Sequence, residues 1–114
     1  MKMGKLKDPA EDLARRILKE VDFKDRLNGF SLRERAGPVP VTLYSFEEVV
    51  SLLNDPHPRL DFNELEGWVR RTMGDTELAE EIAETIRIGR SDQERAIHIR
   101  KLMEERLNQC RKPG

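Results

Sequence analysis

The histidine and cysteine residues that could bind a metal are few in this sequence and far apart. His57 and His98 are its two histidines, and Cys110 is its single cysteine. Metal sites gather His, Cys and carboxylate ligands at short spacings, and neither H-x-x-x-H nor C-x-x-C occurs here. We therefore expect no metal and no cofactor. The simplest interpretation of His98 is an ion pair with Glu94, four residues earlier on one helix.

A catalytic nucleophile is equally hard to place. The positive charges of Arg111 and Lys112 would lower the pKa of the Cys110 thiol, but no general base lies near it in the sequence. We interpret Cys110 as a helix-packing residue. The sequence contains no G-x-S-x-G nucleophile turn and no glycine-rich phosphate loop. These patterns predict no catalytic residue and no cofactor-binding loop.

Three pairs of adjacent glutamates could serve as acids and bases. General acid–base catalysis needs a carboxyl group half-buried in a cleft, whereas all three pairs fall on the surfaces of predicted helices. We therefore expect solvated side chains. An enzyme is the third hypothesis for function, with His57 and Asp61 as the first residues to inspect. The pairs are Glu47/Glu48, Glu80/Glu81 and Glu104/Glu105.

The elements that would position any site belong to one small domain. The chain has 114 residues, of which 38% are charged and 37% hydrophobic, with a formal net charge of −1. These figures predict a single compact domain over residues 8–110, with flexible ends at residues 1–7 and 111–114. We find no signal-peptide pattern and no apolar run that could span a bilayer, and a lone cysteine forms no internal disulfide. We therefore expect a cytoplasmic protein with no membrane contact.

Apolar residues at helical spacing predict five helices. Capping boxes, in which a Ser, Asn or Asp is followed three residues later by Glu, mark four of the starts. Gly74 and Gly89 are placed where a helix ends. The first helix is expected to continue until Asn28-Gly29. The predicted starts are Asp8, Ser45, Asn63, Asp75 or Thr76, and Ser91.

Residues 29–44 change to an alternating pattern that predicts a short β-hairpin. Pro38 and Pro40 cannot donate ladder hydrogen bonds, so the second strand is expected at an edge or to be very short. A two-stranded ribbon is marginal alone and must pack on helices. The fold class predicted is therefore α+β, mostly helical, with about five helices and one short hairpin.

The segment 44–86 carries two motifs, Asn63-Glu64-Leu65-x-x-Trp68-Val69 and Gly74-Asp75-x-x-Leu78-Ala79. They resemble a family of small uncharacterised prokaryotic domains with the pattern Asn-Asp-Phe-x-x-Trp-Ile and then Gly-Asp-x-x-Leu-Ala. Asp61-Phe62 stands where that family often has Tyr-His, so no role for that histidine is carried over. The resemblance implies a fold and no known activity. The residues expected to be structural are Trp68, Gly74, Asp75 and Leu78.

Charge is distributed unevenly along the chain. Residues 44–86 carry eleven acidic and three basic side chains, a net charge of −8. Residues 87–114 carry eight basic and four acidic side chains, a net charge of +4. Two interpretations remain open. Either the two segments face each other within one fold or are solvated, or one of them contacts a partner through its charge.

The leading hypothesis is a non-enzymatic interaction or regulatory module. The last helix has a narrow apolar stripe, and Ile97 and Leu102 lie off that stripe, so their exposure would create an apolar patch. We expect a protein partner or a second copy of the chain to dock on this helix. The predicted partner-binding residues are Arg95, Ile97, Arg100, Lys101 and Leu102.

The alternative hypothesis is a nucleic-acid-associated factor that uses the basic segment 87–101. A helix-turn-helix around Gly74 or Gly89 fits poorly, because polar or charged residues stand where such motifs need small and apolar ones. Glutamates on the fourth helix would also repel phosphates. Nucleic acid is therefore a possible but not a favoured partner.

Overall fold

The computed structural model describes residues 6–33, 37–55 and 60–111. The predicted class is confirmed, because five helices accompany a two-stranded antiparallel hairpin in an α+β fold. The elements in chain order are α1 (Glu11–Ile17), the 3-10 turn η1 (Phe23–Asp25), β1 (Leu27–Arg33), β2 (Gly37–Leu43), α2 (Phe46–Leu53), α3 (Phe62–Arg71), α4 (Thr76–Ile88) and α5 (Asp92–Arg111).

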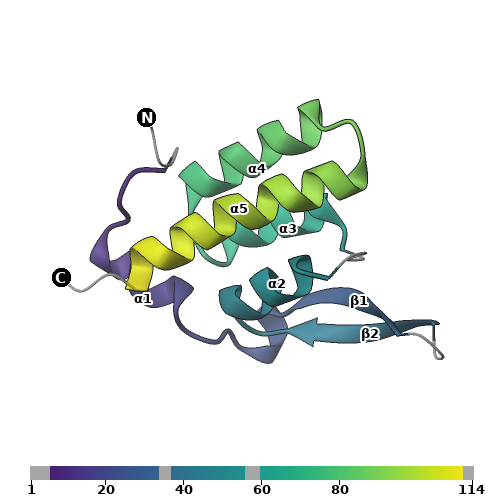
Figure 1. Cartoon of the computed structure of the whole chain (residues 1–114). Helices are drawn as coiled ribbons and strands as arrows, with labels where there is room; N and C mark the ends of the chain where they lie inside the picture. The colour runs from purple at the N-terminus through teal and green to yellow at the C-terminus, as the bar shows by residue number, and fades with distance from the viewer. Residues whose placement is uncertain (1–5, 34–36, 56–59, 112–114) are drawn as a thin grey trace.

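Helix α5 is the element around which the others pack. It runs across the molecule with α4 along one side and α1 and α2 along the other (Figure 1). Helix α3 packs against α4, and the hairpin meets α2 and α3 and then extends away from the helices. A 20-residue helix is long enough to contact three others, which explains why one charged helix organises the fold.

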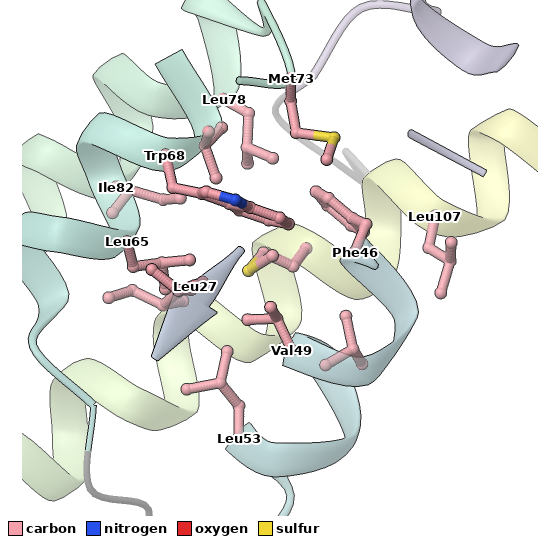
Figure 2. Close-up of a cluster of buried hydrophobic side chains, with 14 of the residues drawn as sticks. Leu27, Phe46, Val49, Leu53, Leu65, Trp68, Met73, Leu78, Ile82 and Leu107 are labelled. Atoms are coloured by element: carbon pink, nitrogen blue, oxygen red, sulfur yellow. The ribbon is translucent and has the colours of Figure 1, made fainter. Parts of the chain in front are cut away.

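The core lies between these helices and the inner face of the hairpin. Trp68 lies near the centre of the buried cluster, with Phe46 and Leu65 among the side chains around it (Figure 2). Met73, Leu78 and Ile82 close the cluster from the α3–α4 side. Burying large aromatic and aliphatic side chains in one cluster supplies the main free energy of folding for a chain of this size.

The first helix is shorter than its sequence pattern predicts. It begins at Glu11 after Ala10, which makes no side-chain capping bond, and it ends at Ile17. The predicted Asp8 cap and the extension to residue 27 are therefore wrong. The backbone N–H of Val21 instead donates to the Tyr44 carbonyl at 2.6 Å. This bond connects the segment after α1 to the end of the hairpin. It is formed in place of the hydrogen bonds that would have extended α1.

Two of the predicted serine caps are confirmed, although the glutamate of each box accepts from the N–H of the residue before the serine. Ser45 Oγ accepts from the backbone N–H of Glu48 at 3.1 Å, and Ser91 Oγ accepts from Glu94 at the same distance. The box predicted at Asn63 is wrong, since Asp61 caps α3 by accepting from the N–H of Asn63 and Glu64. An aspartate two residues upstream was the stronger acceptor.

The hairpin pairs β1 with β2 in a simple antiparallel register. Leu27 lies opposite Leu43 and Arg33 opposite Gly37, with no residue skipped between. In a two-stranded sheet each strand has one free edge, which confirms that the proline-containing strand lies at an edge. It is not short, because β2 spans Gly37–Leu43.

In the described part of the chain, no helix has the length and apolar character needed to cross a bilayer.

Candidate functional site

The five predicted partner-binding residues fall on α5, but the structure uses three of them for internal contacts. The guanidinium of Arg95 donates to the carbonyls of Ile86 at 3.0 Å and Gly89 at 2.7 Å, which closes the α4–α5 turn. Arg100 donates to the side-chain oxygen of Asn54 at 3.0 Å. Leu102 is half-buried and packs against the core.

Ile97 and Lys101 are the two predicted residues that α5 presents to solvent. The Ile97 side chain is 40% exposed, and Lys101 is exposed four residues later on the same face. Ile88, the last residue of α4, is 61% exposed and precedes α5 by a short turn. We call Ile88, Ile97 and Lys101 the α4–α5 surface. It pairs exposed aliphatic side chains with positive charge.

Three of the five basic side chains in segment 87–101 form ion pairs. Arg87 pairs with Glu84, Arg95 with Asp92 and Arg100 with Glu104, each within one helix or its border. Exposed pairs of this kind leave fewer cations for a phosphate backbone. The nucleic-acid hypothesis therefore gains no support from the geometry of these side chains.

Of the two residues named for the enzyme hypothesis, the structure describes Asp61. His57 lies outside the described residues. Asp61 uses its carboxylate as the α3 cap, at 2.9 Å from the Asn63 nitrogen and 3.2 Å from that of Glu64. Among the described residues, no group of three His, Cys, Asp or Glu side chains is placed to hold a metal ion.

Burial has a larger effect on the pKa of Cys110 than the charges near it. The thiol is buried in the core, and burial raises the pKa of Cys110 above its ordinary value, although the charge of Arg106 opposes this. A buried, protonated thiol is a poor nucleophile. This placement agrees with its interpretation as a helix-packing residue.

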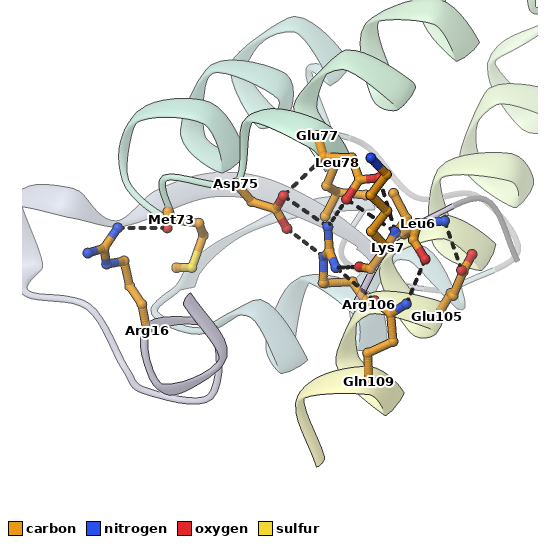
Figure 3. Close-up of polar contacts among 10 residues, drawn as sticks. All are labelled: Leu6, Lys7, Arg16, Met73, Asp75, Glu77, Leu78, Glu105, Arg106 and Gln109. Carbon is orange, nitrogen blue, oxygen red and sulfur yellow. Dashed lines mark hydrogen bonds and ion pairs between the residues drawn. The ribbon is translucent and has the colours of Figure 1, made fainter. Parts of the chain in front are cut away.

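A buried ionic cluster holds the start of the chain against α4 and α5. Arg106, 1% exposed, lies 2.7 Å from Asp75 and 2.9 Å from Glu77 (Figure 3). The same guanidinium donates to the Lys7 carbonyl at 2.6 Å. Gln109 donates to the Leu6 carbonyl at 2.9 Å. We call Asp75, Glu77 and Arg106, with the backbone of residues 6 and 7, the ionic cluster.

The ionic cluster is electrostatically complete. Burial alone would lower the pKa of Arg106, but its hydrogen bonds to Asp75 and Glu77 outweigh burial and raise it. Partial burial would raise the pKa of Glu77, but the Lys7 N–H and Arg106 lower it on balance. Buried charges with satisfied partners hold structure together and leave no group free for proton transfer.

The structural residues predicted from the sequence occupy the core and its turns. The Trp68 indole N–H donates to the Asp25 carbonyl at 2.7 Å. Gly74 has a φ of 74°, Asp75 caps α4 through the Leu78 N–H at 3.0 Å, and Leu78 is fully buried. Residues 1–7 are predicted to be loose. Of these the structure describes Leu6 and Lys7, and Leu6 is buried.

Two hollows on the surface were missed by sequence reasoning. One of about 270 Å³ lies between α1, α2 and the end of α5, where Glu47 pairs with Arg111. The other, of about 340 Å³, lies between η1, the start of β1 and α3. We call it the β1–α3 groove. Its lining residues from η1, around Lys24 and Arg26, were expected inside the first helix, so no pattern pointed to them.

Comparison with protein-family models, with curated proteins and with solved structures finds no match.

Proposed function

We propose that the protein is a non-enzymatic interaction module of the cytoplasm, which binds a second protein surface through the α4–α5 surface. The simplest partner is another copy of the chain, forming a homodimer along α5. The resemblance to small prokaryotic domains remains a prediction and adds no activity to this proposal.

The exposure of Ile97 carries the proposal. Helix α5 buries Ile99, Met103 and Leu107 in the core, and its Leu102 is half-buried against that core. Ile97 stands outside that stripe with Lys101 one turn away, and Ile88 at the end of α4 is also exposed. An aliphatic side chain flanked by a cation is typical of a small protein contact, where burial supplies affinity and charge selects the partner.

Sedimentation of Ile97→Lys beside the wild-type protein tests the proposal. We expect wild-type protein to dimerise as its concentration rises, and Ile97→Lys to shift the dissociation constant at least tenfold toward monomer. The matched control is His98→Lys, an exposed neighbour on the same helix that receives the same new side chain. A monomeric wild-type protein at millimolar concentration, or equal weakening by both variants, would contradict the α5 homodimer.

A further inference from the structure

The outer edge of β2 is closed to strand pairing. Pro40 lies opposite Phe30, and Pro38 lies opposite Leu32. A hydrogen-bonded antiparallel pair exchanges two N–H···O bonds, and proline has no N–H to exchange. These pairs are therefore the non-bonded ones, and both proline nitrogens point outward. Of the three β2 residues that face outward, Pro38, Pro40 and Thr42, only Thr42 has an N–H to donate to an incoming strand.

The outer edge of β1 is open by the same reasoning. Asn28, Phe30 and Leu32 belong to the non-bonded pairs, so their N–H and C=O groups point away from β2. Among the described residues, none forms a hydrogen bond with the backbone of Asn28 or Phe30. The Phe30 side chain is also 46% exposed. Proteins commonly protect such an edge with prolines or charges, and here the prolines protect β2 alone.

The open edge continues into the β1–α3 groove. Leu27 and Asn28 at the start of β1 line this groove, and Trp68 and Arg71 line it from α3. A free strand edge beside a helix is a recurring site for peptides that add as a further strand. Backbone hydrogen bonds then supply affinity, and the groove supplies selectivity for side chains.

The charges of the groove favour an acidic ligand. Lys24, Arg26 and Arg71 line it together with Asp25 and Glu64, which leaves one positive charge in excess. Arg26 is occupied, since its guanidinium lies 3.9 Å from the centre of the Phe23 ring and donates to the Phe23 carbonyl. Lys24 and Arg71 form no ion pair with any described residue, so they are available to a carboxylate.

We propose that β1 binds an extended, acidic segment of a partner protein, which adds as a third strand along residues 28–32 and places a carboxylate beside Lys24 and Arg71 in the β1–α3 groove. The edge offers three N–H and three C=O groups over about 13 Å, at about 3.3 Å per residue. A segment of about five residues fills that length. This site is separate from the α4–α5 surface.

A phage-displayed library of random ten-residue linear peptides, selected on the wild-type protein, tests the proposal. We expect the enriched peptides to contain Asp or Glu, and Arg71→Glu to weaken their binding at least fivefold. Asn28→Pro removes an outward N–H of β1 and should weaken binding at least tenfold. Its matched control is Thr42→Pro, since Thr42 lies directly opposite Asn28 and directs its N–H outward from β2. This control should change binding less than twofold.

A second measurement covers the case in which Asn28→Pro fails to fold. Bound peptide should slow amide hydrogen exchange at Asn28 and Phe30 of the wild-type protein and leave Thr42 unchanged. No enriched peptide, equal loss in both proline variants, or unchanged exchange at Asn28 would overturn the proposal. Protection of Asn28 that grows with protein concentration alone would assign the edge to a second copy and also overturn it. Ile97→Lys should retain peptide binding, so this test is independent of the α5 homodimer.

Discussion

Arg106 is the residue whose environment matters most for stability. Its guanidinium is 1% exposed and depends on Asp75 and Glu77 for neutralisation. A buried ion pair adds little net free energy over an apolar pair, but removing one partner leaves an uncompensated charge. Removing one partner of the ion pair should therefore cost much more stability than the intact pair contributes over an apolar pair.

Asp75→Asn should lower the free energy of unfolding by about 3–5 kcal/mol, because Asn still caps α4 while Arg106 loses its closest carboxylate. Urea denaturation at pH 7 measures this loss. The double variant Asp75→Asn with Arg106→Met should recover much of the stability, since both fully buried charges are then gone and Glu77 is partly exposed. A loss below about 1 kcal/mol in the single variant would show that the cluster tolerates an unpaired guanidinium.

Glu77 gives the ionic cluster a defined pH dependence. Its pKa is lowered in the folded protein from an ordinary value of 4.5, so the ionised form stabilises the fold above that pH. This contribution is lost as the pH falls through 4.5 toward the lower, folded pKa. Urea midpoints measured from pH 7 to pH 3 should fall less steeply for Glu77→Gln than for wild type. Glu20→Gln, a change at an exposed carboxylate, should keep the wild-type slope.

The sequence predicted one of the two roles of Asp75 and did not predict the other. The spacing around Asp75 predicted a cap, and the structure places it there. Asp75 also pairs with Arg106, which lies 31 positions away in the sequence. No local sequence pattern connects two residues so far apart. Long-range pairs depend on how helices pack, which is why the ionic cluster could not be predicted.

At the scale of elements, the α3–α4 turn depends on Gly74. Its φ of 74° lies in the left-handed region, and a Cβ added there would collide with the Arg16 guanidinium. That guanidinium donates to the Met73 carbonyl at 3.2 Å. The α3–α4 turn therefore needs a residue that adopts positive φ at position 74, and it is also held by the hydrogen bond from Arg16 of α1.

Gly74→Ala should destabilise the protein more than Gly37→Ala. Gly37 also has a positive φ, of 69°, but a Cβ there meets nothing within 4 Å. Strain alone should cost about 1–2 kcal/mol at each position, and displacement of Arg16 should add to the loss at Gly74. Thermal or urea unfolding of both variants measures the difference. Equal losses would show that Arg16 moves aside freely.

Element starts followed from the sequence where a polar cap and an apolar stripe agreed. Ser45 and Ser91 are such cases, and both serines cap their helices. The end of α1 could not be predicted, because Leu18 and Val21 keep helical spacing beyond Ile17. The chain leaves the helix there to bond with the end of the hairpin, a tertiary contact that overrides the local pattern.

In the folded molecule, the acidic segment 44–86 and the basic segment 87–114 form ion pairs with each other. Arg106 meets Asp75 and Glu77, and Arg111 meets Glu47, so part of the basic segment is neutralised by the acidic one within the fold. The interpretation that the segments face each other is thus supported for these side chains. The β1–α3 groove was not predictable from charge, since its lining comes from η1, β1 and α3 together.

We expect no binding to random-sequence duplex DNA, even at low salt. The net charge is −1, and Arg87, Arg95 and Arg100 already pair with carboxylates. A polyanion binder needs several free cations on one face. Fluorescence anisotropy with a labelled duplex in 20–50 mM salt measures this. Saturable binding that weakens steeply as salt rises would restore the nucleic-acid hypothesis.

The ionic cluster also governs the order in which the chain can fold. The bonds from Arg106 to Lys7 and from Gln109 to Leu6 join residues 99 and 103 positions apart. On a ribosome, α5 leaves the exit tunnel after every element that it covers. The apolar faces that α5 covers on α1, α2 and α4 stay exposed until α5 has emerged, so the core cannot be completed before that helix is made.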